Sequence, residues 1–79
     1  MRLHEYVAKQ ITSIRESRGL SQRRLALRAQ MPPQTLSRYE QGKTERLDAS
    51  ALRRIARVLG VSMDILLGTQ NESIDDDAA

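Results

Sequence analysis

The most constraining feature of this sequence is a proline pair, Pro32-Pro33, between two short stretches that have helical spacing of apolar residues. Before the pair, Leu25 and Ala29 repeat at an interval that brings them to one face of a helix. A proline lacks the N–H that a helix interior needs and clashes with the preceding turn, so one helix cannot run through this pair. Residues 21–42 therefore predict two short helices joined by a tight turn.

The residues at the ends of these two helices support this prediction. Ser21 can cap the first helix, because its hydroxyl can accept a hydrogen bond from a free backbone N–H. Pro33 suits the first position of the second helix, and Gly42 suits its C-terminal end. Two helices joined by such a short turn form a helix-turn-helix unit.

The second predicted helix has one apolar and one polar face. Leu36 and Tyr39 are expected in the core, together with Met31 from the turn. The outward residues are polar, include no acid and can all form hydrogen bonds: Gln34, Thr35, Ser37, Arg38 and Gln41. Gln and Arg can form paired hydrogen bonds with adenine or guanine edges, so this face is typical of a helix that lies in the major groove of DNA.

The distribution of charge favours a polyanionic partner. All thirteen Lys and Arg lie in residues 1–68 with only six of the ten acids, so this part of the chain carries a net charge of +7. A compact domain with that excess attracts nucleic acid. The other interpretation is that the charge serves solubility alone.

Length and composition limit the remaining possibilities. With 79 residues and 3% aromatic residues, the chain predicts one small domain with an aliphatic core. It has no cysteine and one histidine, which excludes a disulfide framework and argues against a metal site, a cofactor or an enzyme. The chain shows neither a membrane-spanning run nor a signal-peptide pattern, so we expect a cytoplasmic protein with no membrane partner.

Three further helices are expected around the central pair. The first, in residues 1–18, has an apolar stripe of Leu3, Val7, Ile11 and Ile14. Asp48 is the expected N-cap of the fourth helix, and Ser62 that of the fifth. In the fourth helix, the residues expected in solvent are Arg53, Arg54 and Arg57. Residues 1–68 are therefore predicted to be one all-α domain with the helix-turn-helix at about 22–41, and 69–79 an acidic, disordered tail.

The run from Val7 to Gly68 resembles the Cro/lambda-repressor-like (XRE-type) helix-turn-helix family. The similar elements are RGLSQxxLA, SRYExG and LxRIAxxLGVSxDxLL, in this order. The resemblance implies a five-helix lambda-repressor-like fold and a transcriptional regulator that binds double-stranded DNA.

The resemblance also implies roles for individual residues. The base-reading residues would be Pro33, Gln34, Thr35 and Arg38. The residues on the DNA backbone would be Gln22, Ser37, Gln41, Lys43, Thr44 and Arg46, with Glu45 opposing them. Arg15 and Glu40 would form an ion pair that ties the first helix to the recognition helix, and the alternative is two solvated charges.

Two residues depart from the family in the turn. Gln30 replaces the usual Gly, which would cost about 1 kcal/mol if the position keeps left-handed backbone. Pro32 replaces the usual Ser or Thr N-cap, so the recognition helix loses a side-chain cap. From these two departures we expect the turn between the two helices to shift by about one residue at most, while the core positions stay as in the family.

Two hypotheses about function remain open. The first is a sequence-specific repressor that binds a pseudo-palindromic operator as a homodimer, with Met63, Ile65 and Leu67 as candidate dimer contacts. The alternative is a protein-interaction or antitoxin-type module that docks a protein partner through the fifth helix. A separate hypothesis is that the acidic tail competes with DNA for the basic surface.

Overall fold

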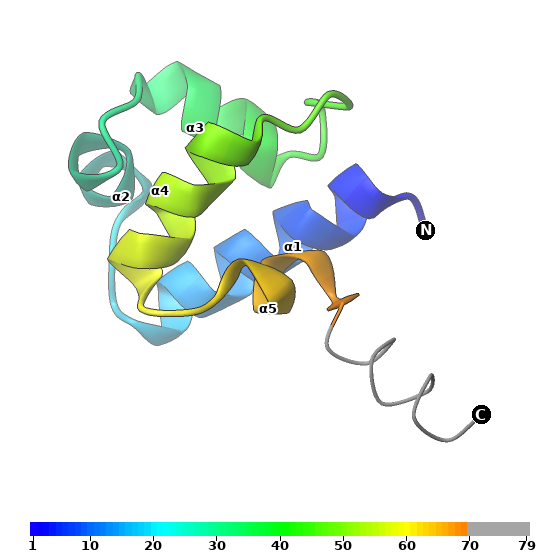
Figure 1. The fold of residues 1–79 in the computed structure, drawn as a ribbon. Coiled ribbons are helices and arrows are strands. Elements are labelled where there is room, and N and C mark those ends of the chain that lie inside the picture. Colours follow the sequence, from blue (N-terminus) through cyan, green and yellow to red (C-terminus); the bar gives the residue numbers. More distant parts are fainter. Residues whose placement is uncertain (70–79) are drawn as a thin grey trace.

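The computed structural model describes residues 1–69, which form five helices and no strand (Figure 1). The helices are α1 (Leu3–Ser17), α2 (Gln22–Arg28), α3 (Pro33–Glu40), α4 (Ala49–Leu59) and α5 (Met63–Leu67). α1 packs against α3, α4 and α5, and α2 packs against α3 and α4. The all-α, five-helix prediction is confirmed. The predicted disordered tail begins at residue 69, and its residues from 70 onward lie outside the described part of the chain.

The helix ends follow the local chemistry of the chain. The Ser21 hydroxyl accepts a hydrogen bond from the Arg24 N–H at 3.1 Å, and the Asp48 carboxylate accepts one from the Ala51 N–H at 3.0 Å. Ser62 caps α5 in the same way. Each cap satisfies a backbone donor that a helix start leaves free, so these residues define where α2, α4 and α5 begin.

The turn between α2 and α3 keeps its expected position despite the two departures. Gln30 has a φ of +57°, the one positive φ of a non-glycine residue in the described chain. Its left-handed backbone lets the Met31 N–H donate back to the Ala26 carbonyl at 3.0 Å, which closes the end of α2. Pro32 has extended backbone and gives α3 no side-chain cap, as expected.

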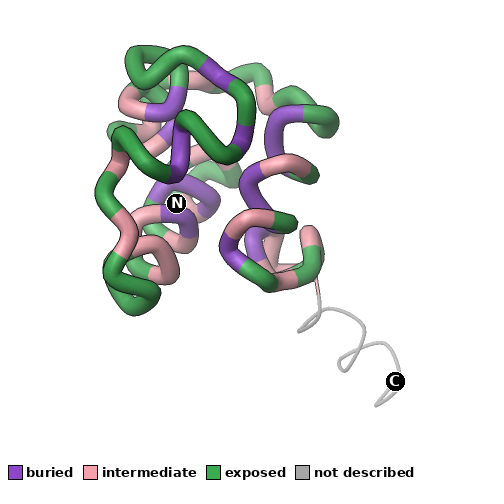
Figure 2. Tube along the Cα trace, turned by 90° about the vertical axis from the view of Figure 1, so that its left-hand side faces the viewer, coloured by how far each residue is buried: buried purple, intermediate pink, exposed green. Residues whose placement is uncertain are grey.

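The core lies where α1, α2, α3, α4 and α5 meet, since each helix contributes buried residues to it. Figure 2 shows these buried segments alternating with exposed ones along the chain. Its largest fully buried side chains are Val7, Ile11, Leu25, Leu36, Leu52, Ile55, Leu59 and Leu66. Leu3, the first residue of the predicted apolar stripe, is not part of this core, because it is 53% exposed. Gly68, just after α5, lies against Tyr6 in the first turn of α1.

Two arginines join helices by donating to free carbonyls at helix ends. Arg54 donates from Nε to the Ala29 carbonyl at 2.8 Å, which joins α4 to the end of α2. Arg18 donates from Nε to the Leu59 carbonyl at 3.1 Å, which joins α1 to the end of α4. The prediction that Arg54 is simply solvated is therefore wrong, because the last carbonyls of α2 need a donor.

Candidate nucleic-acid interface

α3 presents an exposed polar strip on the side opposite the core. Leu36 and Tyr39 are buried. The four residues implied to read bases are all exposed: Pro33, Gln34, Thr35 and Arg38. None of them is acidic, and within the described chain none makes an ion pair at 4 Å or less. Among the described residues, the side chains of Gln34, Thr35 and Arg38 make no hydrogen bond either, so their donors and acceptors are free to meet the edges of bases. Pro33 offers only an apolar ring.

The residues implied to contact the DNA backbone lie along the edges of this strip. Gln41, Lys43 and Arg46 are exposed, and the partly buried members of the set are Gln22, Ser37 and Thr44. Gln41 donates from Nε2 to the Ser37 hydroxyl at 2.8 Å, which holds both side chains on the same side of α3. Gln22 at the start of α2 donates to Glu40 at the end of α3, next to Gln41. The other three residues of the set, Lys43, Thr44 and Arg46, lie in the loop that follows α3.

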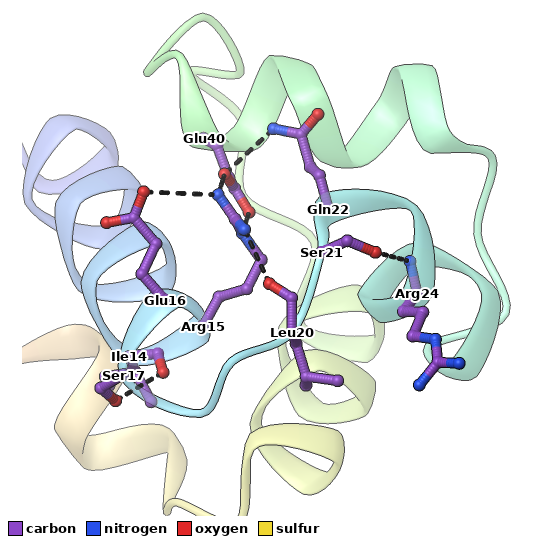
Figure 3. A network of polar contacts seen from close by, with 9 residues as sticks. All are labelled: Ile14, Arg15, Glu16, Ser17, Leu20, Ser21, Gln22, Arg24 and Glu40. Atoms are coloured by element: carbon purple, nitrogen blue, oxygen red, sulfur yellow. Dashed lines mark hydrogen bonds and ion pairs between the residues drawn. The ribbon is translucent and has the colours of Figure 1, made fainter.

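A polar network holds the end of α3 against α1 and α2 (Figure 3). Arg15 donates to the Glu40 carboxylate from Nε at 2.8 Å and from Nη2 at 3.0 Å. Arg15 also donates from Nη1 to the Leu20 carbonyl at 2.8 Å, and Gln22 donates from Nε2 to Glu40 at 3.0 Å. One carboxylate is therefore shared by α1 and α2, which fixes the orientation of α3.

The loop between α3 and α4 is held at both ends. Near its start, the Lys43 N–H donates to the Arg38 carbonyl at 3.0 Å. At its end, the Asp48 N–H donates to the Tyr39 hydroxyl at 3.2 Å, so a buried ring positions the start of α4. We did not predict this role of Tyr39 from the sequence, since nothing local indicates which backbone donor a buried hydroxyl will meet.

Exposed arginines and lysines lie on α2, on α3 and in the loop after it. Arg23, Arg24 and Arg28 are exposed on α2, in addition to the cations of α3 and the loop. In α1, a hydrogen bond from the Arg2 N–H lowers the pKa of Glu5. Across residues 1–69, no three His, Cys, Asp or Glu side chains gather closely enough to hold a metal ion, and no helix is long and apolar enough to cross a membrane.

Two solved structures have folds similar to that of this chain. The clp gene regulator ClgR from Corynebacterium glutamicum has a similar structure, with a TM-score of 0.80 and 26% identity over 99% of this chain and 82% of that chain. A chain of apo-HppE is also similar, with a TM-score of 0.75 and 29% identity, covering 82% of this chain and 36% of that chain. No curated protein sequence matches significantly.

The family comparison covers most of the chain. The family described as Helix-turn-helix matches residues 11–66, a segment that contains α2, α3 and α4, all of α5 except its last residue, and the carboxyl-terminal part of α1. Together with the likeness to a gene regulator, this match supports a DNA-binding regulatory function. The chain therefore belongs to the XRE-type helix-turn-helix family.

Proposed function

We propose that this chain is a sequence-specific transcriptional repressor that binds double-stranded DNA with α3 in the major groove. The observation that carries the proposal is the exposed, acid-free strip of Gln34, Thr35 and Arg38, on a helix whose orientation the Arg15–Glu40 pair fixes. In this arrangement the three side chains read base edges, and Pro33 contacts a thymine methyl group. The activity belongs to the domain of residues 1–68.

The flanking residues hold the DNA backbone. Lys43 and Arg46 supply charge from the loop, while Gln22, Ser37, Gln41 and Thr44 supply hydrogen bonds. Such contacts set the orientation of the domain on the duplex without specifying sequence. The affinity therefore falls as salt rises, because each neutralised phosphate releases counterions.

A homodimer on a pseudo-palindromic operator is the arrangement that suits one short recognition helix, because one half-site gives little specificity. Met63, Ile65 and Leu67 on α5 all keep partial exposure, although Met63 and Leu67 also pack against the core. We assign the dimer contact to these three residues. Sedimentation of wild type and Ile65→Ser in the presence of the operator tests this, and an unchanged dimer in the variant contradicts it.

The test of the proposed function is selection of bound duplexes from a random library, followed by sequencing. We expect an enriched inverted repeat, since a two-fold dimer presents two copies of α3. A promoter that carries the selected repeat should then lose transcription in vitro when the protein is added. Salt-sensitive binding with no enriched sequence contradicts the proposal.

A second candidate function is a protein-interaction module of the same fold. The observation that favours it is an apolar groove of about 340 Å³ lined by Met1, Leu3, Tyr6, Leu67 and Gly68. Two of these residues, Met1 and Leu3, are large exposed hydrophobics. If the library selection yields no sequence, this groove with α5 becomes the leading site, and substitution of Leu3 by Ser should abolish partner binding.

A further inference from the structure

The amino-terminal half of α1 lies directly against the end of the recognition helix and the loop that follows it. A Cβ built on Gly42 would stand 3.8 Å from the Ala8 Cβ and 3.8 Å from the Glu5 Cα, so Gly42 is in contact with α1. Figure 1 shows the start of α1 beside this loop. Surface residues of α1 therefore border the proposed DNA surface, although α1 is not part of the helix-turn-helix unit.

A groove of about 480 Å³ runs between the two elements, lined by Met1, Glu5, Ala8, Lys9, Glu40, Gln41 and Gly42. Lys9 stands on the α1 side and Gln41 on the α3 side. Gln41 also continues the exposed strip of α3. Lys9 is exposed and makes no ion pair at 4 Å or less within the described residues. Its charge is therefore available beside the proposed path of the DNA backbone.

The two acids of this groove are already engaged. The Glu40 carboxylate accepts hydrogen bonds from Arg15 and Gln22. The Glu5 carboxylate accepts one from the Arg2 N–H at 2.9 Å and caps the start of α1. Glu5 keeps its negative charge at neutral pH, so it reduces the attraction of a phosphate to Lys9 without removing it.

Arg2, the residue just before α1, brings a second positive charge to the loop between α3 and α4. The Arg2 guanidinium lies 3.2 Å from the Glu45 carboxylate, with the two side chains 70% and 66% exposed. Such an exposed pair adds little to stability. The pair matters for the charge of the loop. Glu45 is the one acid among residues 42–47 and lies between the proposed phosphate contacts Lys43 and Arg46, so Arg2 offsets the negative charge at this point.

We propose that the start of α1 is a further part of the DNA-backbone surface, with Lys9 as a phosphate contact and Arg2 as the counter-charge that keeps Glu45 from repelling phosphate. This inference rests on the proposed DNA binding. It enlarges the backbone surface beyond the helix-turn-helix unit and assigns Arg2 an indirect, positioning role. It also makes the net charge of the loop dependent on the amino-terminal segment.

The first experiment measures the affinity of Lys9→Ala for the selected operator and for unrelated duplex over a range of salt. We expect a loss of about three- to ten-fold on both duplexes at low salt, and a salt slope smaller by about one phosphate contact. Lys9→Arg should restore the affinity, because it restores the charge. The matched control is Arg57→Ala, an exposed arginine in the last turn of α4, away from the loop.

The second experiment compares Arg2→Ala in the wild-type chain and in a Glu45→Gln background. We expect Arg2→Ala to weaken binding about two- to five-fold in wild type and not at all with Glu45→Gln, since the charge to be offset is then gone. Equal losses in both backgrounds overturn the counter-charge role. A Lys9→Ala effect no larger than that of Arg57→Ala overturns the phosphate contact. If the wild-type chain binds no duplex, the proposed function itself is refuted. This result can be told apart from the two outcomes for the Arg2 and Lys9 variants, which both require a wild-type chain that binds DNA.

Discussion

Arg15 and Glu40 form a two-point ion pair that is almost fully removed from solvent, with side chains 13% and 5% exposed. The pair joins α1 to the last residue of α3 across 25 positions of sequence. Every polar atom of the two partners that is buried has a hydrogen-bond partner in the described chain. Desolvation offsets much of the attraction in such a pair, so its main effect is to orient α3.

Removing one partner should be far more damaging than removing both. Arg15→Ala leaves the Glu40 carboxylate buried without its counter-charge, and we expect a loss of about 3–5 kcal/mol in the free energy of unfolding. The double variant Arg15→Leu/Glu40→Leu should recover most of this loss, since no buried charge remains. Urea denaturation followed by circular dichroism measures both. A double variant as unstable as Arg15→Ala would show that packing, and not the isolated charge, causes the loss.

Substitutions on the exposed strip of α3 should change specificity and leave the fold intact. We expect Gln34→Ala and Arg38→Ala each to weaken binding to the selected operator by about 1–3 kcal/mol and to relax one position of the site. Lys43→Ala is the matched comparison, because loss of a phosphate contact should weaken binding to all sequences alike. Repeating the library selection with each variant measures this, and an unchanged preferred site in the first two variants removes the base-reading assignment.

Gln30 stores backbone strain in the turn before α3. Its φ of +57° is one that glycine adopts without cost. We expect Gln30→Gly to raise the free energy of unfolding by about 0.5–1 kcal/mol, because the relief of strain exceeds the extra freedom of glycine in the unfolded chain. Gln30→Val should lower it, since a β-branched residue fits left-handed backbone poorly. Thermal unfolding of the three proteins tests this order.

Gly68 is required both by its backbone and by its neighbour. It has a φ of +76°, and a Cβ there would stand 3.0 Å from the Tyr6 ring. We expect Gly68→Ala to destabilise the chain by about 1–3 kcal/mol. Gly19→Ala is the control, because Gly19 has a φ of +68° with nothing within 4 Å of its Cβ and so reports the backbone cost alone. Equal losses in the two variants would show that the Tyr6 contact adds nothing.

Glu5 should make a pH-dependent contribution at the start of α1. Its folded pKa lies below the ordinary value, chiefly because the carboxylate accepts the Arg2 N–H. A lowered pKa gives stability that is present above the unfolded-state pKa and is lost as pH falls through the folded-state pKa. We therefore expect Glu5→Gln to be less stable than wild type at neutral pH and the difference to vanish in acid. Denaturant midpoints measured from neutral pH down to pH of about 3 test this, and a difference that is constant with pH contradicts it.

Local signals along the chain were enough to locate the helices and the core. Ser21 and Asp48 begin helices because their side chains satisfy backbone donors within three residues. The proline pair separates α2 from α3, and the 3.6-residue spacing of Leu25, Ala29 and similar residues selects the buried faces. These features involve neighbours in sequence, so they do not depend on how the helices are arranged.

Contacts between residues that are distant in sequence could not be predicted from the sequence and were found only in the tertiary structure. Leu3 continues the apolar stripe of α1 and is nevertheless 53% exposed, because it lines an open groove with Tyr6, Leu67 and Gly68 and is not enclosed by the helices. The sequence predicts that Arg54 is a solvated charge, but in the fold the end of α2 places the Ala29 carbonyl within hydrogen-bond distance of its Nε. Likewise, nothing near Arg2 in the sequence indicates that it will meet Glu45. Periodicity and capping are local and can be read from the chain, whereas the neighbour of an exposed charge depends on which helix ends and loops the fold brings beside it.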